Sequence, residues 1–283
     1  MSNNELIKTD DQSLAEVRKD VDMSFWEHLD ILRFAMMRSF AVVFVLAIVA
    51  FYFTDFVYTQ VILGPKSPDF ITNRLFCQLG DLIGAPSLHI NQGTFKLNNF
   101  EMAGQFKSNL MISFVAGIIV AMPYILTEMW YFIRPALSIK ERKGVRGFVF
   151  VTNFLFISGI SFGYFLVAPL AVNFLVSWTL SPDIENTLRL GSYISMVVMI
   201  SLSTGIVFQL PVLIYFLARM GIVSVALLKT YRKHAIVAFF LLSALITPPD
   251  IFSQILVAFP LIFLYEISIK IAKRVEKNKI MEL

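Results

Sequence analysis

Residues 235–269 read AIVAFFLLSALITPPDIFSQILVAFPLIFLYEISI, and the break within them sets the number of membrane crossings. The two apolar segments of this stretch, Ala235–Ile246 and Ile251–Ile269, flank the tetrapeptide Thr247-Pro248-Pro249-Asp250. Because proline lacks a backbone donor and disfavours helical geometry in the residue before it, we expect the helix to stop there. A hairpin at this point gives the chain six membrane crossings, whereas one continuous helix gives five.

Four longer apolar runs precede this stretch, and each has the roughly 20 residues that a bilayer crossing needs. Apolar residues make up 57% of the 283 residues and charged residues 16%, against about 45–50% and 25% in soluble domains. The sequence therefore predicts an all-α integral membrane protein. The four runs are Phe34–Phe53, Asn109–Ile133, Gly147–Trp178 and Ser192–Ala218.

Lysine and arginine residues decide between five and six crossings, because they accumulate on the cytoplasmic side of membrane proteins. With six crossings and both termini inside, 19 of the 24 basic residues are cytoplasmic. Five crossings would instead place the basic tail, residues 270–283, outside. We therefore predict six transmembrane helices, N-in and C-in, with the last two short. The basic residues left outside are Lys66, Arg74, Lys96, Lys107 and Arg189.

This topology divides the chain into a cytoplasmic segment (residues 1–33), a six-helix transmembrane domain (34–269) and a cytoplasmic tail (270–283). The first twenty residues hold no apolar core, so we expect the first span itself to direct insertion. Within the external loop, residues 54–107, apolar residues recur at helical spacing in Ile71–Ile83. This pattern predicts a short amphipathic helix on the outer face.

Catalytic and cofactor motifs are absent from the sequence. It has no Gly-x-Ser-x-Gly, no His-Glu-x-x-His and no glycine-rich phosphate loop, and Cys77 is its one cysteine. The Lys and Arg residues sit between apolar runs and form no long basic block of the kind that binds nucleic acid. We therefore expect no enzyme activity, no metal or other cofactor and no nucleic-acid partner.

Polar groups at membrane depth are costly and tend to line an interface or a cavity. Gln209 lies in the middle of the fourth run beside Pro211, which frees a backbone carbonyl one turn earlier. We expect Gln209 either to bond a neighbouring helix of the same chain or to face a cavity.

Acidic residues gather near the predicted cytoplasmic face. Glu141 lies in the basic loop after the second run, and Glu27 and Asp30 precede the first run. Glu141 is either a solvated member of a charge run or part of a site for a cationic peptide. The second reading has a physical basis, because carboxylates accept paired hydrogen bonds from guanidinium groups.

An ordered series of motifs runs along the chain from His28 to Glu266. The motifs are His28-Leu29-Asp30-Ile31-Leu32-Arg33, Phe132-Ile133-x-Pro135-Ala136-Leu137 with Glu141-Arg142, Phe156-x-x-Gly159-x-x-Phe162-x-Tyr164 with Pro169, Phe208-Gln209-x-Pro211-Val212, Gly221-Ile222-Val223 with Arg232, and Thr247-Pro248-Pro249-Asp250 with Phe252-Ser253-Gln254. In this order they resemble the TatC family, the multi-spanning receptor subunit of the twin-arginine (Sec-independent) protein translocase.

The resemblance implies a receptor in the bacterial cytoplasmic (inner) membrane that binds twin-arginine signal peptides of folded cargo at the cytoplasmic face. It further implies a homo- or hetero-oligomer with single-span TatA- and TatB-type partners, and export driven by the proton motive force. Glu141 would be the principal carboxylate for the arginine pair, and Gln209 and Pro211 would face the partners. The remaining implied residues are Phe132, Arg33, Pro135, Leu137 and Arg142 in the peptide site, and Pro65, Asp250 and Gln254 at outer-face positions that affect assembly.

Two departures from the family pattern bear on the peptide site. The family's amino-terminal Glu position is Ile31 here, so the second carboxylate is Asp30, Glu27 or absent. The family's Gln-x-Trp pattern reads Glu128-Met129-Trp130, which adds a third acidic group. We hypothesise that Glu128, Asp30 and Glu141 share the binding of the signal peptide.

A secondary transporter for small solutes or ions is the alternative function, because it shares the apolar composition. That class predicts polar residues at several mid-membrane positions and often paired broken helices. Here mainly Gln209 and Pro211 fit that description.

Overall fold

Apolar helices form nearly all of the regular structure. The computed structural model describes residues 25–281 apart from 86–88, 92–94, 134–144, 182, 184–186 and 249. Within these residues, the predicted all-α membrane fold is confirmed. Five segments are long and apolar enough to cross a membrane: Leu29–Tyr52, Gly104–Phe132, Val149–Ser177, Leu190–Arg219 and Ile251–Lys277.

The elements divide into long helices and short connecting pieces. The long helices and their direct continuations are α2 (Phe25–Tyr52), α5 (Gly104–Ile133), α7 (Val145–Phe162) with η5 (Gly163–Val167) and α8 (Ala168–Ser177), α9 (Leu190–Val207) with α10 (Leu210–Arg219), α12 (Arg232–Ile246) and α13 (Ile251–Met281). The connecting pieces are α3 (Thr54–Phe56), η1 (Val57–Ile62), η2 (Gly64–Lys66), α4 (Ile71–Ile83), β1 (Leu97–Asn98), β2 (Leu188–Arg189) and α11 (Val225–Thr230). The strands β1 and β2 pair in parallel, with Leu97 opposite Leu188.

The helix predicted at Ile71–Ile83 is confirmed as α4. The last two helices differ from the prediction that both are short. This expectation holds for α12, with 15 residues, but it is wrong for α13, which has 31 and continues to Met281. The tail after Ile269 is rich in Lys, Arg and Glu, which are good helix formers, so it extends the helix.

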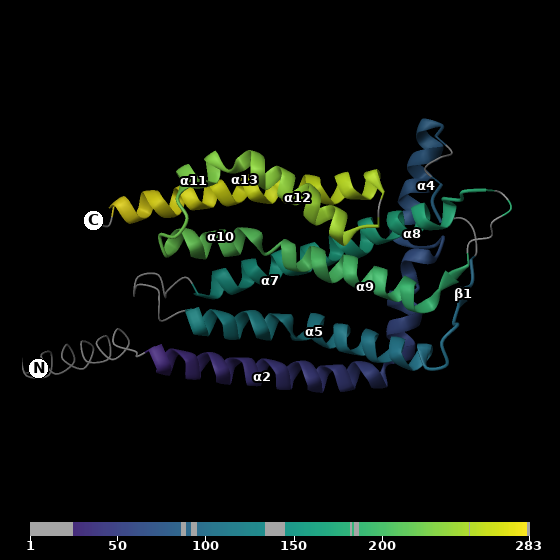
Figure 1. Ribbon diagram of the computed structural model, residues 1–283, viewed down its shortest axis with the longest axis horizontal. Coiled ribbons are helices and arrows are strands. Elements are labelled where there is room, and N and C mark those ends of the chain that lie inside the picture. Colours follow the sequence, from purple (N-terminus) through teal and green to yellow (C-terminus); the bar gives the residue numbers. More distant parts are fainter. Residues whose placement is uncertain are drawn as a thin grey trace, which may run out of the picture.

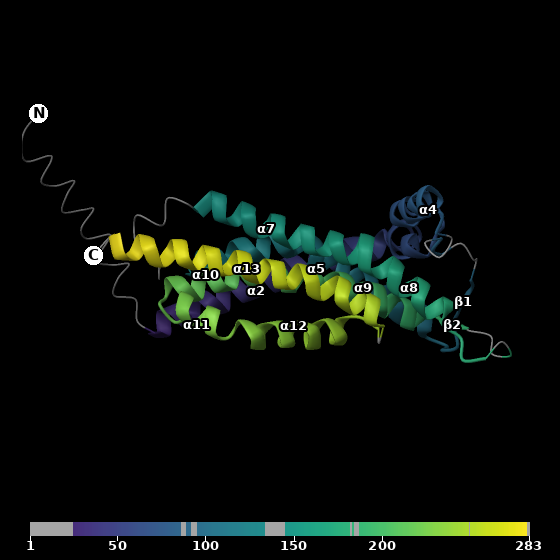
Figure 2. The same ribbon diagram turned by 90° about the horizontal axis from the view of Figure 1, so that it is seen from above.

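The long helices lie side by side, and α4 runs across one end of them, nearly perpendicular to their axes (Figures 1 and 2). The first turns of α2 and the last turns of α13 lie at the opposite end of the bundle (Figure 1). We call this opposite end the α2 end and the other the α4 end. Both views also show α12 running beside α13.

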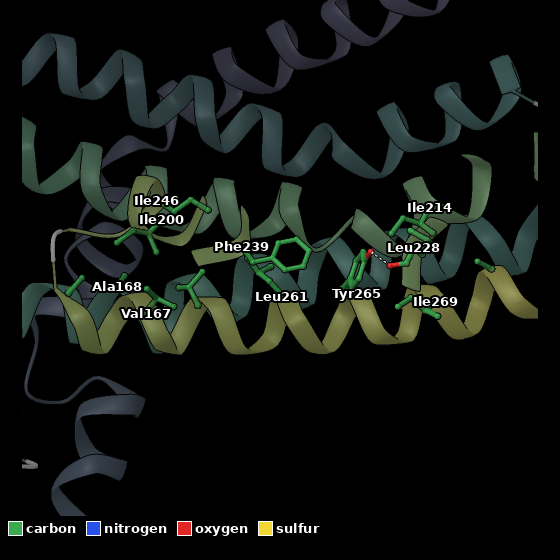
Figure 3. Close-up of a cluster of buried hydrophobic side chains, with 13 residues drawn as sticks. Val167, Ala168, Ile200, Ile214, Leu228, Phe239, Ile246, Leu261, Tyr265 and Ile269 are labelled. Carbon is green, nitrogen blue, oxygen red and sulfur yellow. Dashed lines mark hydrogen bonds between the residues drawn. The ribbon is translucent and has the colours of Figure 1, made fainter. Parts of the chain in front are cut away.

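The largest buried cluster joins the second half of the chain to the third span (Figure 3). Phe239 of α12 and Tyr265 of α13 meet edge to face, with ring centroids 5.6 Å apart. The Tyr265 hydroxyl donates a 2.9 Å hydrogen bond to the carbonyl of Leu228 in α11. The ring contact joins the two helices of the hairpin, and the hydrogen bond joins α13 to α11. Other members of the cluster are Val167, Ala168, Ile200, Ile214, Ile246, Leu261 and Ile269.

Glycines let the third and fourth spans approach closely. A Cβ at Gly159 of α7 would lie 2.7 Å from the Thr204 carbonyl oxygen of α9, and one at Gly163 would lie 2.1 Å from the Thr204 hydroxyl. Small residues at four-residue spacing are a common way for membrane helices to pack closely. The sequence signal for this crossing is the Gly159-x-x-x-Gly163 pattern.

Gly159→Ala is expected to destabilise the protein by about 1–3 kcal/mol, the typical cost of overpacking. The added methyl group meets the backbone of α9, which a side-chain rotation cannot relieve. Gly147→Ala on the same helix is the matched control, because nothing lies within 4 Å of its Cβ position. Thermal unfolding in detergent measures both variants, and an equal midpoint for the two would contradict the close crossing.

Candidate functional site

The described residues of the predicted peptide site lie toward the α2 end of the bundle. Asp30 and Arg33 are exposed on the first turns of α2, and Phe132 is half-buried in the last turn of α5. The structure therefore puts residues from both helices at this end. Pro135, Leu137, Glu141 and Arg142 lie outside the described residues, as does the side chain of Glu27.

Glu128 is buried, and its carboxylate contacts two side chains of the same chain. Its Oε2 lies 3.1 Å from Nη2 of Arg38 on α2, and its Oε1 accepts a 2.7 Å hydrogen bond from the Tyr124 hydroxyl. The carboxylate is 10% exposed, whereas the Arg38 side chain is 59% exposed. The third acidic group of the hypothesis thus belongs to an ion pair that joins α2 to α5.

Arg38 was not among the predicted site residues, although the sequence carries a signal for it. It interrupts an apolar run, and a charge at such a position needs a partner or a route to water. Arg38 is four residues after the start of the first run (Phe34) and Glu128 is five residues before the end of the second (Ile133), so antiparallel runs place the two at a similar depth. Two opposite charges in adjacent spans therefore indicate a pair.

Gln209 lies at the break between α9 and α10, where Pro211 occupies the first turn of α10. Its Nε2 donates a 3.0 Å hydrogen bond to the Thr152 carbonyl of α7. Its Oε1 is buried and accepts no hydrogen bond from the described residues. Both alternatives from the sequence therefore apply in part: the amide bonds a neighbouring helix, and it also lines a cavity.

This cavity, which we call the Gln209 groove, has a volume of about 560 Å³ and an almost wholly apolar wall. Its wall comes from α5, α7, α9, α10 and α12. Trp130 and Phe216 line it together, with ring centroids 5.8 Å apart. Since Met129 and Trp130 also line it, the groove reaches the part of α5 that follows Glu128.

Pro65, one of the predicted outer-face residues, is buried at the α4 end. Its carbonyl accepts hydrogen bonds from Nδ2 of Asn73, at 3.2 Å, and from Nδ2 of Asn91, at 3.3 Å. Asn91 Nδ2 also lies 2.9 Å from the Pro169 carbonyl of α8. The connection after α2 is thereby fixed to the third span. The sequence carries no signal for either asparagine. The carbonyls that Asn91 bonds are 26 and 78 residues away in the chain, and those that Asn73 bonds are six and eight residues back, which no local turn motif predicts.

Asp250 and Gln254 stabilise the hairpin between α12 and α13. Oδ1 of the buried Asp250 accepts a 2.6 Å hydrogen bond from the backbone N–H of Ser253, as a helix cap does. Gln254 Nε2 donates to the Phe240 carbonyl of α12 at 3.0 Å. The hairpin predicted at residues 247–250 is present, since α12 ends at Ile246 and α13 begins at Ile251.

Comparison with known proteins gives a consistent result. Residues 27–260 match the family model described as Sec-independent protein translocase protein (TatC). The chain is 38% identical to the TatC protein of Blattabacterium over 91% of its length and 98% of that protein, and 36% identical to that of Desulforapulum autotrophicum over 93% and 88%. A crystal structure of the twin arginine translocase receptor TatC superposes with a TM-score of 0.69 at 29% identity, covering 88% of this chain and all of that one.

Arg38→Gln is expected to lower the free energy of unfolding by about 1–3 kcal/mol, because it leaves the buried Glu128 carboxylate with Tyr124 as its only partner among the described residues. Glu128→Gln should cost less, since the Arg38 guanidinium is more than half exposed and can turn to water. The double variant should recover part of the loss. Thermal unfolding in detergent measures all three.

Arg33→Gln, at an exposed position earlier on α2, is the matched control and should leave the midpoint unchanged. Equal losses from Arg38→Gln and Arg33→Gln would contradict a stabilising ion pair.

Proposed function

Because this chain belongs to the TatC family and is a core subunit of the Sec-independent, twin-arginine protein translocase, we propose that it binds twin-arginine signal peptides at the α2 end. In this proposal the α2 end faces the cytoplasm of a bacterium, and the protein lies in the inner membrane. The chain acts as a receptor and carries out no catalysis itself.

The observation that carries the proposal is the pair of Glu128 and Arg38. A carboxylate at the α2 end already holds a guanidinium, with one oxygen 3.1 Å from the nearest nitrogen. The arginine of that pair is mostly exposed, so an arginine of a bound peptide has physical access to the same region. In this proposal two further carboxylates bind the twin-arginine motif: Asp30, which is exposed on α2, and Glu141, which follows α5 in the sequence.

A topology of six crossings with both termini inside is part of the proposal. The start of α2 and the end of α13 lie at the same end of the bundle, which supports an even number of crossings (Figure 1). With its 15 residues α12 spans about 22 Å, less than the bilayer core, so the membrane would thin around it. Residues 1–33 and 270–283 would then be cytoplasmic, and residues 54–107 external.

The Gln209 groove is proposed as the contact site for single-span TatA- or TatB-type partners. A helix that crosses the membrane alone offers an apolar surface, which suits the apolar wall of the groove. The buried Oε1 of Gln209 accepts no hydrogen bond from the described residues, and a donor on a partner helix would satisfy it. Pro65, Asp250 and Gln254 would affect assembly indirectly, through the α4 end that they hold in place. The proton motive force would supply the energy.

Site-specific photocrosslinking of a signal peptide tests the receptor proposal. The variants Glu141→Gln, Asp30→Asn and Glu128→Gln should each reduce crosslinking to a peptide with two arginines. One charge-assisted hydrogen bond is worth about 1.5–3 kcal/mol, which corresponds to a loss of affinity of about tenfold or more. The unaltered chain should not capture a peptide with two lysines in place of the arginines.

Glu276→Gln is the matched control, since Glu276 is an exposed carboxylate on α13 near the same end. It should leave crosslinking unchanged. Unchanged crosslinking in all three site variants, with each protein inserted and folded, would sink the shared-carboxylate hypothesis.

A further inference from the structure

The helix α4 turns polar and small residues toward the protein and apolar residues outward, the reverse of a surface helix in a soluble protein. Its buried residues are Thr72, Asn73 and Gly80. Asn73 donates hydrogen bonds to the carbonyls of Pro65 and Ser67, and the Thr72 hydroxyl donates to the Phe165 carbonyl of η5. The side of α4 that faces the protein is therefore held by polar contacts.

The exposed surface of α4 divides into an apolar stripe and a polar edge. The stripe, formed by residues 71, 75, 79 and 82, recurs at intervals of three and four and so occupies one side of the helix. The polar edge, about a quarter turn away, holds Arg74 and Asp81. The stripe residues and their exposed fractions are Ile71 (62%), Leu75 (53%), Leu79 (51%) and Leu82 (83%).

The depth of α4 can be estimated from its contact with the third span. Phe165, which accepts the Thr72 hydrogen bond, lies sixteen residues after the start of that span at Val149, or about 24 Å along a helix. The hydrocarbon core of a bilayer is about 30 Å thick. With the hydrocarbon taken to begin at Val149, the start of α4 lies about 6 Å inside the opposite edge of the hydrocarbon, on the side away from the α2 end. Interfacial helices are buried to a similar depth, about 5–10 Å.

The stripe continues an apolar surface that the third span presents to lipid. Phe165 is exposed on η5, and its ring stacks on that of Phe70, with centroids 5.6 Å apart. Ile71, the first residue of the stripe, follows Phe70 directly. Because α4 is nearly perpendicular to the spans, it carries this surface sideways, across their axes (Figures 1 and 2).

We propose that α4 lies in the outer surface of the bilayer, with its stripe in the boundary between the headgroups and the acyl chains. Three observations favour lipid over a second protein as the occupant: the depth of the helix, its orientation and the continuity of the stripe with a lipid-facing span. The polar edge keeps Arg74 and Asp81 in the headgroup region, where both stay hydrated. The connection after α2 would then be anchored on both sides, to the third span and to the membrane.

Fluorescence quenching on the full chain in nanodiscs tests this location. Cysteines at two adjacent positions carry the same environment-sensitive probe, in a Cys77→Ser background: Leu82→Cys in the stripe and Asp81→Cys on the polar edge. Lipids brominated near the headgroup should quench the probe at position 82 at least twofold more than the probe at position 81. Aqueous iodide should show the opposite order.

Nanodiscs that hold a single copy of the chain separate lipid from protein as the occupant. Strong iodide quenching at position 82 in such discs, equal to that at position 81, would overturn the proposal. Protection of position 82 only in discs that hold two copies or a partner protein would also overturn it, since a protein would then cover the stripe. Native thermal midpoints for both labelled variants show that the comparison concerns folded protein.

Discussion

The hydrocarbon layer offers no hydrogen-bond partner to a bare backbone group, and the structure depends on meeting this constraint wherever a helix breaks. Side chains supply the missing bonds at such points. Asp250 accepts from the first turn of α13 after the proline pair. Asn73 and Asn91 bond the Pro65 carbonyl in the connection after α2.

This constraint explains why several positions that match family motifs form hydrogen bonds within the chain. Pro65, Asp250 and Gln254 all take part in the bonds of the α4 end, so their effect on assembly need not involve direct contact with a partner. The pair of Glu128 and Arg38 is different, because it joins two unbroken helices and repairs no backbone. The proposed receptor site gives this charged pair a second role in peptide binding, besides joining α2 to α5.

Run length and composition predicted the long helices, because the thickness of the bilayer fixes how many apolar residues a crossing needs. The limits of α4 were also predictable, since the apolar periodicity ends at Gly84, whose positive φ of 64° closes the helix. The pairing of Arg38 with Glu128 could not be predicted in full, because it depends on how α2 and α5 are rotated about their axes. The length of α13 was missed because a polar helix and a polar tail have the same composition.

A receptor site at the α2 end requires that end to be cytoplasmic, so the side of the membrane that each end of α13 faces is decisive. Labelling with a membrane-impermeant maleimide measures this in intact cells, using Ile251→Cys and Lys273→Cys in a Cys77→Ser background. Both positions are exposed. We predict labelling of position 251 from outside and of position 273 only after the membrane is opened. Labelling of position 273 in intact cells would contradict six crossings and the cytoplasmic receptor site.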